Sequence, residues 1–218
     1  MTFQEIAHNE AIRMYIQRAD ESLVALGFTE HSFSHVTHVA TMAGNILETL
    51  GYDAHSVEMA KIAGYLHDIG NLVNRVEHSQ SGAVMAFSIL HDLNCPVEDI
   101  ATIVTAIGNH DEGTGVPVNA VAAALILADK ADVRRSRVRN RDISKFDIHD
   151  RVNYSVTDSK LIIGEAHDTV TLELIVDPAF SSVMDYFEIF LHRMTFCRKA
   201  AHKLGMQFKL TINGQALI

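Results

Sequence analysis

Most of the chain carries apolar residues at the three- and four-residue spacing of amphipathic helices. The first such stretch places Ile6, Ile12 and Ile16 on one face and stops at Gly27, as helices often do at glycine. Further stretches of the same kind follow one another as far as residue 135, so the first part of the chain is predicted to be helical. The predicted helices cover residues 4–27, 32–51, 53–66, 78–90, 96–109 and 118–135.

The pattern changes after about residue 150. Asn153–Ile163 and Thr169–Val176 are rich in β-branched residues and alternate between apolar and polar, which is typical of strands, and the turn residues between them predict a hairpin. Pro178 predicts the start of a long helix to Leu204, and Gln207–Ile212 predicts a last strand. The fold class expected is mainly α, with a small C-terminal antiparallel β-sheet.

Length and composition favour one domain. The chain has 218 residues, of which 48% are hydrophobic and only 12 are glycine and 3 proline, so it can bury a sizeable core. We expect a single domain over residues 1–218, with the hairpin, long helix and final strand of residues 150–218 appended to a helical core. An exposed edge of that sheet offers a surface for a homodimer.

The charge of the chain limits its partners. The net charge is −9, and Met1–Asp129 holds 16 acidic residues against 4 basic ones. Such a surface repels a phosphate backbone, so general nucleic-acid binding is not expected. The longest apolar run, Ala120–Ala128, has nine residues, whereas a bilayer-spanning helix needs about 20. With no signal-peptide pattern and with Cys95 and Cys197 far apart, we expect a cytoplasmic protein without membrane contact.

Histidine is the unusual residue of this composition. The chain has 13 histidines, and eight of them lie between His31 and His110. Histidine is the commonest metal ligand in proteins and a frequent proton carrier. His31, His35 and His38 share one helix face, and of these His31 and His38 are interpreted as neighbours of a site or as surface residues.

Asp129 is the most informative acidic residue, because it follows the apolar run Leu125–Ala128. A buried carboxylate costs several kcal/mol, on the order given by transfer measurements, unless it is paired with a cation or bound to a metal. His67 and Asp68 are adjacent at the predicted end of a helix, where a glycine at position 70 opens the backbone. The two features together indicate a metal site built from several helices.

Taken in order, His35, His67-Asp68, His78, His110 and Asp129 form the pattern H…HD…H…H…D. This order resembles that of the HD-domain superfamily of metal-dependent phosphohydrolases. Residues 66–70 resemble the family's L-H-D-I-G, and residues 127–132 resemble the segment that contains its A-D-x-x-D. The resemblance implies an HD-domain helical bundle, with the metal-binding core over residues 28–135.

The resemblance also implies a binuclear site in which Asp68 bridges two divalent transition-metal ions. Iron is expected, with manganese, nickel and zinc as alternatives, because the ligands are imidazoles and carboxylates. The implied ligands are His35, His67, Asp68 and Asp129 for one ion, and His78 and His110, with Asp68, for the other.

Candidate residues for proton transfer and substrate binding lie near these ligands. Besides Asp68, the residues His38, Asp111 and Glu112 are candidates for carrying a proton. A basic segment with six cationic residues in twelve positions, 134–145, follows Asp129, and it is either a phosphate site or a solvated loop or subunit interface. The candidates for phosphate binding are Arg75, Lys130, Arg134 and Arg135.

The function expected from these residues is hydrolysis of a phosphate ester of a small molecule or nucleotide by metal-activated hydroxide. Asn71 stands where the cyclic-dinucleotide phosphodiesterases of this superfamily carry lysine, which argues against a cyclic dinucleotide. Two alternatives remain open at this point. One is a di-iron oxygenase of the same fold that cleaves a C–C or C–P bond, and the other is a regulatory or binding module without catalysis.

Overall fold

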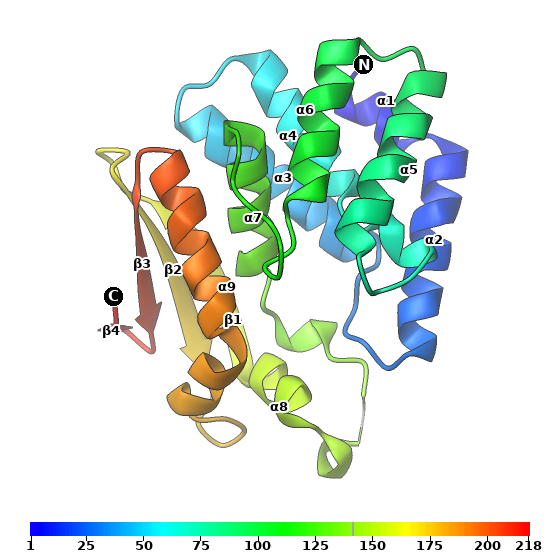
Figure 1. Ribbon diagram of the computed structural model, residues 1–218. Helices are drawn as coiled ribbons and strands as arrows, with labels where there is room; N and C mark the ends of the chain where they lie inside the picture. The colour runs from blue at the N-terminus through cyan, green and yellow to red at the C-terminus, as the bar shows by residue number, and fades with distance from the viewer. Residues whose placement is uncertain (141) are drawn as a thin grey trace.

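The computed structural model describes residues 1–140 and 142–218 of the chain. Helices form one body, and a small sheet with its own covering helix lies at one side of it (Figure 1). The helices are α1 (Phe3–Ala7), α2 (Glu10–Ala25), α3 (Phe33–Thr49), α4 (Ala54–Leu66), α5 (His78–Asp92), α6 (Val97–Gly108), α7 (Ala120–Ala131), α8 (Ile148–Ser155) and α9 (Val183–Lys203). The short 3-10 helices are η1 (Ile69–Leu72), η2 (Arg135–Arg137) and η3 (Ile143–Lys145), and the strands are β1 (Val156–Ile163), β2 (Thr169–Val176), β3 (Gln207–Ile212) and β4 (Gln215–Ala216).

Polar side chains fix the starts of the helices that carry the site. Ser32 caps α3 by accepting a hydrogen bond from the amide of residue 34, and Asp53 caps α4 in the same way at 2.8 Å from the amide of residue 56. Asn119 caps α7 at 2.8 Å from the amide of residue 122. These bonds satisfy backbone donors that no helical partner can satisfy, so the three helices begin at defined residues.

The structure differs from the predicted helix boundaries at both ends of the helical body. The predicted helix 4–27 is divided into α1 and α2, because Asn9 accepts bonds from two following amides and starts a new helix. The helix predicted to reach residue 135 ends at Ala131, and the next residue, Asp132, leaves the helical conformation with a fully buried side chain. The basic segment therefore lies outside α7, and its Arg141 lies outside the described residues.

The C-terminal elements also start at other residues than predicted. Residues 148–155 form the helix α8, with Asp147 as its cap, where a strand was predicted to begin at Asn153. The last helix begins at Val183, because Ser182 and Asp185 form a reciprocal capping box. Proline at position 178 therefore precedes the helix and does not begin it.

The small sheet has the order β1-β2-β3-β4. The predicted hairpin is confirmed, since β1 and β2 are antiparallel neighbours. The expectation of an all-antiparallel sheet is wrong: β2 and β3 pair parallel, with Val170 opposite Phe208 and Leu172 opposite Leu210. The reason is that α9 carries the chain back across the sheet, which is the connection a parallel pair requires. The homodimer stays a prediction.

The helices α3, α4 and α7 pack closely at the centre of the molecule. A Cβ atom at Gly64 of α4 would lie 2.7 Å from the Cα of Ala40, so the backbones of α3 and α4 approach more closely there than any other residue would allow. Leu125, Ile126 and Leu127 of α7 are fully buried, and α7 also contacts α9 (Figure 1). This packing holds the end of α7, and with it Asp129, beside the ends of α3 and α4.

Among the helices that the structure describes, none combines the length and the apolar character needed to cross a bilayer.

Candidate metal centre

Helix ends from five elements converge beside a cavity of about 400 Å³, and four of the converging side chains, those of Asp68, His78, His110 and Asp129, line it. The converging side chains are predominantly buried, and they come from segments nearly one hundred residues apart in the sequence. They are His35 of α3, His67 and Asp68 at the end of α4, His78 at the start of α5, His110 after α6 and Asp129 of α7. The structure thus brings together all six predicted ligands.

The first cluster consists of His35, His67 and Asp129. The Oδ1 atom of Asp129 lies 3.4 Å from Nε2 of His35 and 3.7 Å from Nε2 of His67. Both of these nitrogen atoms are buried, and neither has a hydrogen-bond partner among the described residues. A buried polar atom without a partner is costly, and a metal ion between the two imidazoles and the carboxylate would satisfy both nitrogens.

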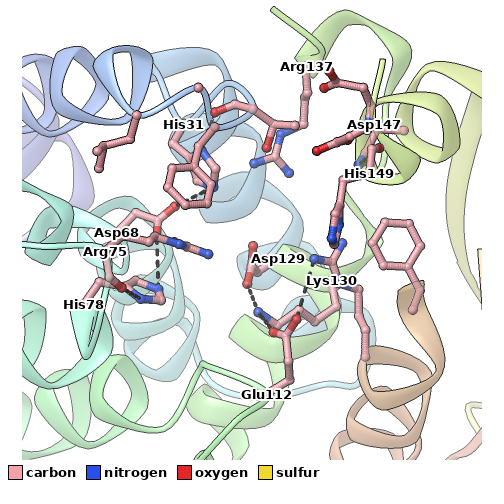
Figure 2. A pocket seen from close by; sticks show the side chains of 18 of the residues that line it. His31, Asp68, Arg75, His78, Glu112, Asp129, Lys130, Arg137, Asp147 and His149 are labelled. Atoms are coloured by element: carbon pink, nitrogen blue, oxygen red, sulfur yellow. Dashed lines mark hydrogen bonds and ion pairs between the residues drawn. The ribbon is translucent and has the colours of Figure 1, made fainter. Parts of the chain in front are cut away.

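The second cluster consists of His78 and His110, near Oδ1 of Asp68, and His110 also lies close enough to His67 and Asp68 for these three residues to hold one ion. The Nε2 atoms of His78 and His110 are 3.1 Å apart, and they lie 3.5 and 3.9 Å from Oδ1 of Asp68. The other carboxylate oxygen of Asp68, Oδ2, lies 3.2 Å from Nε2 of His67. Figure 2 shows Asp68 and His78 on one side of the cavity, with Asp129 next to Lys130 and Glu112. Asp68 therefore has one oxygen toward each cluster.

The orientation of each imidazole is set by its other nitrogen atom. Nδ1 of His67 and Nδ1 of His110 each lie 2.7 Å from a backbone carbonyl oxygen, those of Gly64 and Ile107. Nδ1 of His78 lies 3.1 Å from another backbone carbonyl oxygen. With Nδ1 donating to these acceptors, each Nε2 carries its lone pair toward the carboxylate of Asp68, which is the tautomer that binds a metal ion.

Burial and neighbouring charges keep His110, Asp129 and Asp68 in the protonation states of metal ligands. Burial, with the nearby charges of His67 and Lys130, lowers the pKa of His110 to about 3, so its imidazole is neutral. Burial alone would raise the pKa of Asp129, but Lys130, with Nζ 2.7 Å from Oδ2, holds it well below its usual range. The pKa of Asp68 is also well below its usual range, because the surrounding histidines outweigh the effect of burial. Neutral imidazoles and ionised carboxylates are the forms that bind divalent cations.

The structure places only part of the predicted phosphate-binding set in the cavity. Arg75 and Lys130 line it, but the amine of Lys130 is already paired with Glu112 at 2.6 Å as well as with Asp129. Arg134 and Arg135 lie outside the lining, because α7 ends before them. Arg134 pairs with Asp132, and Arg135 pairs with Asp177 and donates to the carbonyl of Tyr154.

The predicted proton carriers do not all lie in the cavity. Glu112 lines the cavity, whereas His38 and Asp111 do not. The side chain of His38 is 41% exposed, and its nearest acidic neighbour is Asp132 at 3.9 Å. His38 instead lines a second pocket, together with Thr41 and Leu161.

The cavity lining also includes residues that were not among the predicted site residues, His31, Arg137 and Arg193 among them. Nε2 of His31 lies 3.9 Å from Oδ2 of Asp68, and its Nδ1 lies 2.7 Å from the carbonyl of Thr29. The four-residue spacing between His31 and His35 was the available signal for this placement. Arg137 and Arg193 also line the cavity: Arg137 belongs to the basic segment 134–145, whereas no local pattern in the sequence points to Arg193.

Four histidines and two aspartates thus surround buried nitrogen atoms that have no hydrogen-bond partner among the described residues, and this arrangement could hold metal ions. The family model of the HD domain matches residues 32–152, which include all six of these residues and more than half of the chain. The chain belongs to the HD-domain family.

Individual curated proteins are also similar to this chain. The chain is 25% identical over 173 residues to an uncharacterized protein of Methanocaldococcus jannaschii, which covers 68% of this chain and 66% of that protein. It is 25% identical over 119 residues to ribonuclease Y of Bacillus subtilis, covering 55% of this chain and 21% of the enzyme. It is also 32% identical over 102 residues to ribonuclease Y of Lawsonia intracellularis, covering 47% and 18%.

The chain therefore spans just under two thirds of the archaeal relative and about a fifth of the ribonucleases. A crystal structure of a predicted HD superfamily hydrolase from an uncultured Thermotogales bacterium is similar at a TM-score of 0.43 and 23% identity, covering 62% of this chain and 75% of that one.

Proposed function

We propose that this protein is a metal-dependent phosphohydrolase that acts on a phosphate ester of a small molecule. One observation carries the proposal: the buried Nε2 atoms of His35 and His67 have no partner among the described residues and face the carboxylates of Asp68 and Asp129. This arrangement lies at a cavity of small-molecule size, which several cationic side chains line.

The residues present fit two divalent ions. His35, His67 and Asp129 would hold the first, and His78 and His110 the second, with one oxygen of Asp68 directed to each. Iron, manganese, nickel and zinc all accept such a set of imidazole and carboxylate ligands, and iron is our first choice. A divalent ion bound there would lower the pKa of water and polarise a phosphoryl oxygen of the substrate.

The chain's own residues prepare this site by fixing Asp68 and Asp129. The side-chain amide of Asn71 donates to Oδ1 of Asp68 at 2.9 Å, and it also donates to the backbone carbonyl of Asp68 at 2.9 Å. Lys130 holds the second oxygen of Asp129. Both carboxylates are therefore oriented before any ion or substrate arrives, which reduces the cost of reorganisation.

Glu112 acts as a partner for Lys130 and Arg193 in this proposal, and not as a general base. Burial alone would raise the pKa of Glu112, but Lys130 and Arg193 lower it to about 2. A general base works best when its pKa lies near the working pH, so a carboxylate with so low a pKa accepts a proton poorly.

Cavity size and charge favour a small phosphorylated substrate over RNA. The cavity volume of about 400 Å³ suits a molecule of nucleotide size or smaller. The chain's net charge of −9 opposes a long phosphate backbone on its surface. The name of the ribonuclease relatives suggests RNA hydrolysis, so the test below includes an RNA substrate.

The test is a measurement of phosphate release by protein purified without chelators and analysed for metal content. Phosphomonoesters, nucleotides and an RNA oligonucleotide are compared, each with and without oxygen, with Asp68→Asn as the control variant. We expect phosphate release from small monoesters, independent of oxygen and absent in D68N. Oxygen-dependent products without phosphate release would identify an oxygenase instead. Cleavage of RNA alone would overturn the substrate class, and a metal-loaded protein that releases nothing would favour a binding module.

A further inference from the structure

Arg193 belongs to α9, which lies beyond the residues matched by the HD-domain family, yet it lines the metal-site cavity. The helix α9 connects β2 with β3 and packs against α7, the helix that carries Asp129 (Figure 1). The C-terminal unit therefore contributes a cation to a cavity whose metal-site residues all come from the family core.

The guanidinium of Arg193 is held in place but has hydrogen-bonding capacity left. It lies over the ring of Phe190, with Cζ 4.3 Å from the ring centroid, and Nη2 is 3.7 Å from Oε1 of Glu112. Its Nε atom is buried without a hydrogen-bond partner in the described part of the chain. Since a guanidinium has five N–H donors, a group of this kind can still bind an anion.

Two other cations of the cavity are already engaged. The buried amine of Lys130 is paired with two carboxylates, those of Glu112 and Asp129. Arg137 donates to the backbone carbonyl of Glu30 at 2.9 Å and to that of Asp132 at 2.7 Å. Lys130 and Arg137 thus stabilise the walls of the cavity.

Arg75 is the counterpart of Arg193 beside Asp68. Its Nη1 atom lies 3.3 Å from Oδ1 of Asn71 and 3.9 Å from Oδ1 of Asp68, and its side chain is about one-third exposed. Figure 2 shows Arg75 beside Asp68 and His78, whereas Glu112, the partner of Arg193, lies beside Lys130. The two arginines therefore lie at different parts of the cavity wall.

The charge balance of the cavity favours an anion once metal is present. Among the described lining residues, five carboxylates face four cationic side chains. A single divalent ion reverses that balance and leaves the cavity net positive. The carboxylates are Asp68, Glu112, Asp129, Asp147 and Asp150, and the cations are Arg75, Lys130, Arg137 and Arg193.

We propose that Arg193 is a substrate-binding residue that donates hydrogen bonds to phosphate oxygens of the small phosphorylated substrate. The C-terminal unit then takes part in substrate recognition and not only in stabilising the fold. This inference rests on the proposed phosphohydrolase function. The inference goes beyond that function because it assigns recognition of the substrate phosphate to a residue outside the matched family segment.

The test compares Arg193→Gln and Arg193→Lys with the matched control Arg198→Gln, an exposed arginine on the same helix outside the cavity lining. Binding of inorganic phosphate to the metal-loaded protein is measured by titration calorimetry, together with the metal content of each variant. We expect R193Q to weaken phosphate binding by roughly tenfold or more, as for loss of a charge-assisted hydrogen bond. R193K should lose less, because it keeps the charge, and R198Q should bind as the wild type does.

Steady-state kinetics on a hydrolysed monoester supply a second measurement. R193Q should raise KM more than it lowers kcat, since the residue acts in binding. Equal phosphate affinity and equal KM in R193Q and R198Q, at equal metal content, would overturn the proposal. If R193Q weakens phosphate binding but no ester is hydrolysed by the wild type, the anion site stands and the proposed function fails. Thermal unfolding of each variant shows whether the fold is retained, and R193K supplies the comparison if R193Q is unstable.

Discussion

The carboxylate of Asp132 accepts a hydrogen bond of 2.7 Å from Nδ1 of His35, and both side chains are fully buried. His35 lies on α3, whereas Asp132 caps the end of α7, so this bond joins two of the helices that form the metal site. The bond leaves Nε2 of His35 directed toward Asp129 at 3.4 Å. Asp132 is thus a positioning residue for a predicted metal ligand.

Replacing Asp132 with asparagine should weaken metal binding without removing a ligand. Loss of such a partner of a ligating histidine costs about 10- to 100-fold in metal affinity. Affinity is measured by metal titration of chelator-treated protein. Because Asp132 also pairs with Arg134, the unfolding temperature of the metal-free variant is measured beside it. Wild-type affinity in a folded D132N would contradict the role assigned to this bond.

The position of Asp68 between the two histidine clusters predicts different metal counts for different variants. We expect about two ions per chain in the wild type and about one in His110→Ala, which removes a ligand of the second cluster only. Asp68→Asn should lose both ions, since one oxygen is directed to each cluster. Elemental analysis after dialysis measures the counts, with the exposed His91→Ala as control. Two ions per chain in H110A as well would show that His110 is not required to hold an ion.

The ordered histidines and aspartates could be found from the sequence because their order, with the motifs at residues 66–70 and 127–132, resembles that of the HD-domain superfamily. Asp129 also stood out as a carboxylate following an apolar run. The contacts of Arg193 could not be found, because they depend on the packing of α9 against α7, which no local pattern records. Strands β1, β2 and β3 were predictable from their alternating pattern, whereas the short β4 and the parallel pairing of β2 with β3 were not.

The end of α7 shows how tertiary contacts override a local pattern. Residues 131–135 continue the helical pattern, so the helix was predicted to carry Arg134 and Arg135. In the structure the carboxylate of Asp132 is buried between His35 and the guanidinium of Arg134, and the helix stops at Ala131. His35, the partner of Asp132, lies 97 positions earlier in the chain. The sequence near the helix end therefore could not reveal this contact.

Glu112 should make stability depend on pH in the acidic range. Its pKa is about 2 in the folded protein, whereas the ordinary value is 4.5. Burial alone would raise this pKa, but the positive charges of Lys130 and Arg193 lower it. A carboxyl with a lowered folded pKa stabilises the protein fully above the unfolded pKa, and this contribution is lost as the pH falls from about 4.5 toward 2.

Glu112→Gln tests this dependence in chelator-treated protein. The variant should be less stable than the wild type at pH 7, and the difference should shrink by about 1 kcal/mol between pH 7 and pH 4. Urea unfolding at both pH values measures it, with the exposed Glu98→Gln as the control. A stability difference that is the same at pH 7 and pH 4 would show that Glu112 does not titrate as the structure indicates.

Gly70 should be irreplaceable because α5 begins directly against it. A Cβ atom at this position would fall on the carbonyl oxygen of His78 and the amide nitrogen of Gly82, and within 2.7 Å of Oγ of Ser81. Two of these atoms are backbone, so Gly70→Ala must displace the first turn of α5, which carries His78. We expect a loss of about 1–3 kcal/mol in unfolding free energy, as for overpacking.

Because Gly70→Ala displaces His78, we also expect this substitution to lower the affinity for one metal ion more than for the other. Gly108→Ala is the matched control, since a Cβ there would meet only Cβ of Ala83 at an ordinary 3.5 Å. Alanine at that helix position should leave stability unchanged or raise it by up to about 1 kcal/mol. Urea unfolding and metal titration of both variants decide the matter. If Gly70→Ala is as stable as Gly108→Ala and binds both ions normally, the close approach of α5 to Gly70 is not what positions His78.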